Sequence, residues 1–90
     1  MNDFQYSQHK LQIVATKRTS HLKTINDIER KIVQDKALLN NLNHEMSEER
    51  KNELIRYIAN NEARLPILIC VMEVLNEIFD KATTTVNNYS

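Results

Sequence analysis

Apolar residues recur at alternating steps of three and four along most of this 90-residue chain, and this spacing constrains its fold more than any other feature. In the second half, the series contains one polar residue. Its members are Leu54, Ile58, Asn61, Leu65, Leu68, Met72, Leu75, Phe79, Ala82 and Val86. Such spacing is typical of a helix that buries a narrow seam against another helix. The sequence therefore predicts an all-α fold.

The first half carries a similar but weaker seam. With Phe4 at heptad position a, the a and d positions up to residue 46 hold 9 apolar residues among 13. The a positions are Phe4, Leu11, Arg18, Ile25, Ile32, Leu39 and Met46, and the d positions are Ser7, Val14, His21, Ile28, Asp35 and Leu42. Arg18 and His21 follow one another in this series, so the seam is weakest there. We expect a helix over residues 4–43.

A break between two helices is expected at residues 43–47. Residues 40–44 are rich in asparagine, which has low helix propensity. Ser47 is a typical N-cap residue, and Glu48 and Glu49 after it favour the positive end of a helix dipole. The alternative is one uninterrupted helix through this region. The chain contains no glycine, which disfavours tight β-turns. We predict a single domain over residues 1–90, an antiparallel helical hairpin of coiled-coil type.

Pro66 lies inside the second predicted helix, over residues 48–82. It cannot donate a hydrogen bond to the carbonyl of Glu62, so a kink is expected near residues 62–66. The kink could instead divide the second half and leave a third short helix after Pro66. The β-branched and polar tail, residues 83–90, is expected to fray.

The two halves carry opposite charge. Residues 1–36 hold seven Lys or Arg and four Asp or Glu, giving +3, and residues 37–90 hold five and eight, giving −3. This asymmetry favours antiparallel pairing, either within one chain or between two chains placed head to tail.

Residues 65–79 hold a second row of apolar side chains, turned by roughly 110° from the seam. It consists of Ile67, Val71, Val74 and Ile78. Burying four such side chains would contribute roughly 6–12 kcal/mol, so we expect the row to be covered. We predict that a partner chain covers it, either a second copy or a different protein. The alternative is that residues 1–20 fold back over it as a third helix.

Candidate chemistry is sparse. His9, His21 and His44 lie 12 and 23 residues apart, which does not match the spacing of metal ligands on a helix. Cys70 stands among apolar residues and is expected to be a buried, inert thiol. We therefore predict no catalytic residue, metal, cofactor or small-molecule substrate, and no enzymatic activity.

Residues 4–26 contain no acid and carry Lys10, Lys17, Arg18 and Lys23. Such a segment could contact a phosphate backbone, but a solvated helix face is the more usual meaning of cations spread in this way. No membrane span is expected, because the uncharged stretch between Arg64 and Glu73 is far shorter than the roughly 20 residues required. A cytoplasmic location is expected, since residues 1–10 have no apolar signal region.

The string Glu62-Ala63-Arg64-Leu65, followed by the apolar residues 67–79, resembles the C-terminal helix of the small co-chaperones of type III secretion needle subunits. The resemblance covers roughly residues 28–81. It implies a helical hairpin clasped by a helical-repeat chaperone, the two together holding an aggregation-prone secretion subunit in the cytoplasm. It also implies that the row from Ile67 to Ile78 contacts the partner.

The expected function is therefore that of a non-enzymatic interaction protein, acting as a chaperone or adaptor. Two alternatives remain open at this point. One is a small nucleic-acid-binding protein, and the other is a helical inhibitor or regulator of the kind that phages and mobile elements encode.

Overall fold

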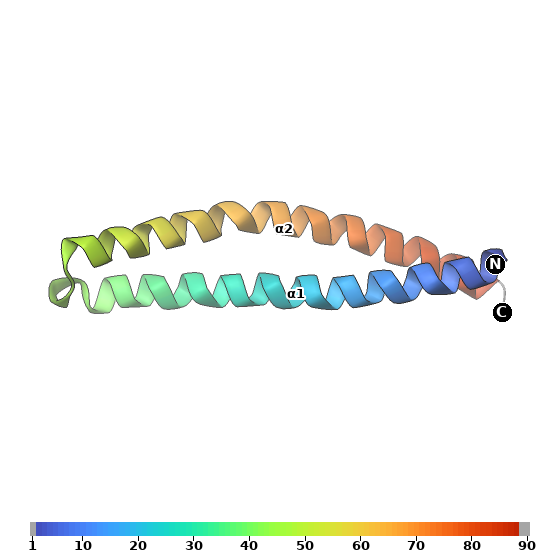
Figure 1. The fold of residues 1–90 in the computed structure, drawn as a ribbon, viewed down its shortest axis with the longest axis horizontal. Coiled ribbons are helices and arrows are strands. Elements are labelled where there is room, and N and C mark those ends of the chain that lie inside the picture. The colour runs from blue at the N-terminus through green and yellow to red at the C-terminus, as the bar shows by residue number, and fades with distance from the viewer. Residues whose placement is uncertain (1, 89–90) are drawn as a thin grey trace.

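The computed structural model describes residues 2–88, which form an antiparallel hairpin of two long helices (Figure 1). Helix α1 spans Asp3–Asn41, a short 3-10 helix η1 spans Asn43–Glu45, and helix α2 spans Glu48–Asn88. The rod measures 63 × 17 × 16 Å, with both ends of the chain opposite the turn. The prediction of an all-α helical hairpin is confirmed. Within residues 2–88, no stretch of either helix is long and apolar enough to cross a membrane.

Local capping interactions determine where both helices begin. At the start of α1, the Asn2 side chain accepts a hydrogen bond from the Gln5 backbone N–H at 2.8 Å, and the Gln5 side chain accepts one from Asn2. At the start of α2, the Ser47 hydroxyl accepts a hydrogen bond from the Arg50 backbone N–H at 3.1 Å. These contacts satisfy N–H groups that have no partner inside the helix.

The turn closes without glycine. Helix α1 ends at Asn41, two residues before the expected end at residue 43, and the Leu42 N–H donates to the Leu38 carbonyl at 2.9 Å. The 3-10 helix η1 then begins at Asn43. Met46 is extended, with φ −97° and ψ 148°, and no described residue has a positive φ. The reversal therefore needs no left-handed residue, which explains how a glycine-free chain forms it.

Helix α2 continues through Pro66, so the alternative of a separate third helix is corrected. The ribbon bows gently over its middle (Figure 1). Pro66 lies on the exposed side of the helix, while Leu65 and Leu68 on either side of it are half-buried. Packing on both sides of the proline therefore holds the two segments in one helix, despite the missing hydrogen bond at Glu62.

The end of α2 is also corrected. The structure places residues 83–88 in the helix, where a frayed tail over residues 83–90 was expected; residues 89–90 lie outside the described part. Ala82 is buried and Val86 is half-buried, so the seam extends beyond residue 82. This packing, along the seam series that runs to Val86, stabilises the last turns of α2 in spite of their β-branched and polar composition.

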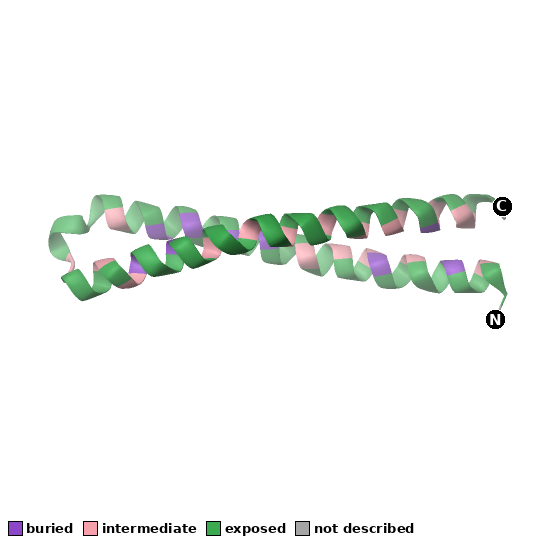
Figure 2. Ribbon diagram, turned by 90° about the horizontal axis from the view of Figure 1, so that it is seen from above, coloured by how far each residue is buried: buried purple, intermediate pink, exposed green. Residues whose placement is uncertain are grey.

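The core is the single seam between the two helices, and it follows the heptad positions identified in the sequence. Buried residues lie on the sides of α1 and α2 that face each other (Figure 2). The buried apolar residues are Val14, Ile25, Ile28, Ile32, Leu54, Ile58 and Ala82. Leu54 is the most buried of them, at 1% exposure, and lies in the half of the rod nearer the turn. The remainder of the seam is half-buried, which gives a thin core.

Asp35 occupies a d position of this seam and is fully buried. Its Oδ1 atom lies 3.0 Å from the Nζ atom of Lys31, four residues earlier on α1, and Lys31 itself is half exposed. No hydrogen bond to either carboxylate oxygen is found among the described residues, so the ion pair alone offsets the lost hydration. A buried polar group of this kind reduces stability while favouring one register of the seam.

Replacing Asp35 by Leu should therefore stabilise the hairpin. We expect the free energy of unfolding to rise by about 1–3 kcal/mol, because a buried charge is exchanged for an apolar seam residue and Lys31 can be hydrated. Urea titration followed by far-ultraviolet circular dichroism measures this. Glu73→Leu, at an exposed position of α2, is the control and should change stability by less than about 0.5 kcal/mol. A D35L variant less stable than the parent would contradict the expectation.

Replacing Pro66 by Ala should also stabilise α2. Alanine restores a backbone N–H that can donate to the Glu62 carbonyl, and proline is about 3 kcal/mol less favourable than alanine inside a helix. Thermal melts should rank P66A above P66G, and P66G above the parent. If P66A melts at or below the temperature of the parent, the bow at Pro66 is needed for packing along the seam.

Candidate functional site

The second apolar row of α2 lies outside the seam and is open to solvent. Ile67 is 66% exposed, Val74 49% and Val71 42%, while Ile78 is half-buried. The other helix leaves most of this row uncovered, because each helix of a two-helix seam buries a stripe of only about 100°. The row predicted from the sequence thus forms a strip on α2 in which three of the four side chains are exposed and the fourth is half-buried.

Residues 1–20 do not cover this row, so the alternative of a third helix folding back is corrected. The described part of the segment, from Asp3 onward, is the first half of α1 and continues the seam. Ser7 and Val14, at its d positions, are buried there. These residues are already committed to the seam and cannot also pack on the row.

A groove joins the row to α1. Its lining consists of Thr16, Lys17, Ser20, His21 and Thr24 from α1, and Val71 and Leu75 from α2. A neighbouring hollow on α1 shares Thr16 and Lys17 with this groove and also includes Ile13. Ile13 is therefore next to the groove that contains Val71, and it is 56% exposed.

Ile13 and Tyr6 extend the apolar surface onto α1, and sequence reasoning missed both. Tyr6 is 60% exposed and lies seven residues before Ile13, on the same side of the helix. Tyr6 and Ile13 each stand one residue before a buried d residue of α1. On α2, Ile67 and Val74 stand in the same way one residue before the half-buried seam residues Leu68 and Leu75. The offset is visible in the sequence, but which side of α1 lies beside the row depends on how the two helices pack.

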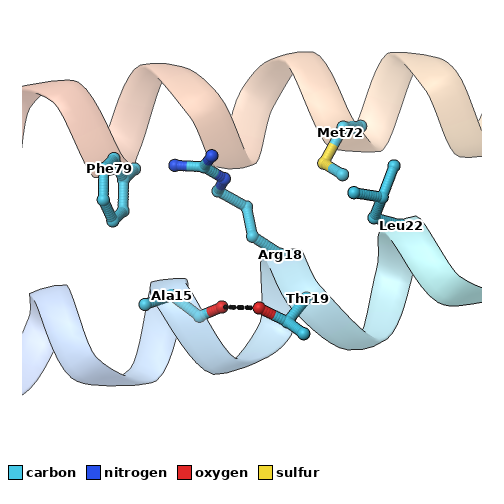
Figure 3. A pocket seen from close by; sticks show the side chains of 6 residues that line it. All are labelled: Ala15, Arg18, Thr19, Leu22, Met72 and Phe79. Atoms are coloured by element: carbon cyan, nitrogen blue, oxygen red, sulfur yellow. Dashed lines mark hydrogen bonds between the residues drawn. The ribbon is translucent and has the colours of Figure 1, made fainter.

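A second groove opens on the opposite side of the seam (Figure 3). It is lined by Ala15, Arg18, Thr19, Leu22, Met72 and Phe79. Arg18 reaches across from α1, and its guanidinium carbon lies 4.2 Å from the centre of the Phe79 ring. The Thr19 hydroxyl donates to the Ala15 carbonyl at 3.0 Å. The cation and the hydroxyl are thus both engaged in structural contacts, and the lining includes no acid or histidine that could act as a base.

His21 and Cys70 have structural positions, and His9 and His44 are exposed. His21 Nε2 donates to the Leu68 carbonyl at 2.6 Å, which links the helices where the seam is interrupted. Among the described residues, no three His, Cys, Asp or Glu side chains gather into a metal-binding group. Cys70 is exposed, which corrects the expectation of a buried thiol, because position 70 lies on the outer side of α2 away from the seam.

The four cations of residues 4–26 do not form one patch. Arg18 packs over Phe79, and Lys17 lines the groove beside Val71 on the other side of the seam. Lys23 is exposed on the outer side of α1, away from both grooves. A cross-helix ion pair joins Lys36 Nζ to Glu62 Oε1 at 2.9 Å, in keeping with the opposite charges of the two halves.

The contact between Arg18 and Phe79 should contribute to stability beyond its buried area. A double-mutant cycle with Arg18→Gln and Phe79→Leu should give a coupling energy of about 0.5–1 kcal/mol, measured by chemical denaturation. The cycle that pairs Lys23→Gln with Phe79→Leu serves as the control and should be additive. Additive behaviour of Arg18 and Phe79 would mean that the stacked arrangement contributes no energy of its own.

No protein-family model, no curated protein and no solved structure matches the chain. The resemblance to secretion co-chaperones therefore stays a prediction. Any functional conclusion has to come from the surface of the hairpin itself, and above all from the exposed row.

Proposed function

We propose that this chain is a non-enzymatic protein–protein interaction protein of the chaperone or adaptor type. It acts by burying the row Ile67, Val71, Val74 and Ile78 against a partner chain. The observation that carries the proposal is the exposure of three successive β-branched side chains of the row, Ile67, Val71 and Val74, with Ile67 two-thirds exposed.

The energetics support a covered state. Fully burying a Val or Ile side chain contributes about 1.5–3 kcal/mol, and much of the area of Ile67, Val71 and Val74 is still in water. A contiguous apolar strip on a thin hairpin is also an aggregation hazard when it is bare. A partner that covers the strip would gain binding energy and protect the hairpin from aggregation.

The specific form of this proposal is a co-chaperone for a type III secretion needle subunit, working in the cytoplasm. The hairpin architecture is consistent with that role, since the resemblance implies two helices joined by a polar turn. In such an assembly, a helical-repeat chaperone would contact the row on α2. Nucleic-acid binding has less support, because Arg18 packs on Phe79 and Lys23 lies away from Lys17.

The test is a double substitution in the row, Val71→Asp with Val74→Asp. Both positions are exposed, so the hairpin should keep its helical circular dichroism and melt within a few degrees of the parent. Two charges in the contact should weaken partner binding or self-association at least tenfold. Light scattering measures the mass of the purified chain, and affinity capture from the source cells measures partner binding.

A matched control lies on the same helix. Ile55 and Ile69 are 52% and 43% exposed, similar to Val74 and Val71, but they lie outside the row. The variant I55D/I69D should retain binding. If V71D/V74D remains an unchanged stable monomer that captures the same proteins as the parent, the row is not an interface and the proposal fails.

A further inference from the structure

The exposed row on α2 has a cation at each end. Arg64 precedes Ile67 by three residues and Lys81 follows Ile78 by three, so the three-four spacing of the row includes both cations. Toward the turn, Arg64 lines a hollow with Lys31 of α1 and the exposed Tyr57. Positive charge therefore borders the apolar strip along the axis of the rod.

Helix α1 adds further cations beside the strip. Lys10 and Lys17 alternate with the exposed Tyr6 and Ile13 at steps of three and four, and Lys17 lines the same groove as Val71. We call the combined surface the lateral face. Its members are Tyr6, Lys10, Ile13, Lys17, Ser20 and Thr24 of α1 and Arg64, Ile67, Val71, Val74, Ile78 and Lys81 of α2.

No acid belongs to the lateral face. The α1 series reaches an acid just beyond each of its ends: Asp3 lies three residues before Tyr6, and Asp27 lies three residues after Thr24, where its Oδ1 atom forms an ion pair with Arg30 at 3.0 Å. The acids in the same part of α2 are Glu73, Glu77 and Asp80, and the helical repeat places them on its outer and opposite sides. A chain with no net charge thus presents one face on which, between these flanking acids, every charged side chain is a cation.

The shape of the lateral face suits another helix. Two antiparallel helices leave a groove between them, and a third helix lying in that groove would extend the hairpin into a bundle. The strip from Ile67 to Ile78 spans about 17 Å at 1.5 Å per residue. An occupant would therefore need at least three helical turns.

We propose that the partner contributes an acidic amphipathic helix, which lies in this groove and buries its apolar stripe against the row. Its flanking Asp and Glu side chains pair with Lys10, Lys17, Arg64 and Lys81. This inference rests on the proposed function and specifies the partner. A second copy fits less well, because a two-fold contact between lateral faces would place like charges opposite each other.

The direct test uses two synthetic helical peptides of about five turns. They share one apolar stripe and carry Glu or Lys, respectively, at every flanking position. Fluorescence anisotropy should show the full chain binding the Glu peptide at least tenfold more tightly than the Lys peptide. The preference should shrink several-fold between 50 and 300 mM salt, because part of it is electrostatic.

Charge reversal on the chain provides the matched comparison. K10E/K17E should abolish the preference between the peptides, because two new acids then offset Arg64 and Lys81, while V71D/V74D should bind neither peptide. Lys17 and Lys23 are both exposed on α1, so K23E makes the same charge change outside the lateral face and should leave binding unchanged, in contrast to K17E. We call the capture of a protein from the source cells row-dependent if V71D/V74D abolishes it. The captured amount of any such protein should also fall at least tenfold with K10E/K17E.

Several outcomes would overturn the acidic helix but leave the proposed function intact. One is a dimer in light scattering that V71D/V74D abolishes, which would make a second copy the occupant. Another is row-dependent capture that K10E/K17E does not alter. The acidic helix would also be overturned if the chain bound both peptides equally or bound neither. The same holds if it bound vesicles containing phosphatidylserine but not the Glu peptide. Capture that is independent of the row overturns the proposed function as well.

Discussion

The packing of two helices along one seam is the constraint on which the rest of this structure depends. Each helix can bury only one stripe, so every apolar side chain outside the seam stays in water unless another chain covers it. Ile58 and Val71 illustrate the difference: both lie on α2 and both are β-branched, yet one is buried and the other is 42% exposed. The same geometry that makes the hairpin thin leaves its lateral face available.

Four polar residues occupy seam positions on α1; Ser7 is small and buried, and the three larger ones are each accommodated differently. Arg18 stacks over Phe79, His21 donates to the Leu68 carbonyl, and Asp35 pairs with Lys31 of its own helix. The first two contacts cross between the helices, so sliding one helix by a turn would break both. The seam therefore gains a defined register at positions where it loses apolar contact.

Much of the fold could be predicted from the sequence, because its determinants are local. The seam positions follow from helical spacing, and Ser47 signals the start of α2 by its capping chemistry. The continuity of α2 through Pro66 and the exposure of Cys70 could not be predicted so directly, since both depend on how the other helix packs. The row on α2 was visible in the spacing, but its extension to Ile13 required knowing which sides of the helices meet.

In the proposed interaction, the arrangement of charge would let a chain with no net charge discriminate between partners. With no net charge, the hairpin exerts little long-range attraction on nucleic acids or other polyanions, and salt screens exposed charges beyond about 10 Å. The cations of the lateral face act at shorter range, beside the side chains of the row. In the proposed complex, the row would supply most of the contact area, and the lysines and arginine would select among helices by the charge beside their apolar stripe.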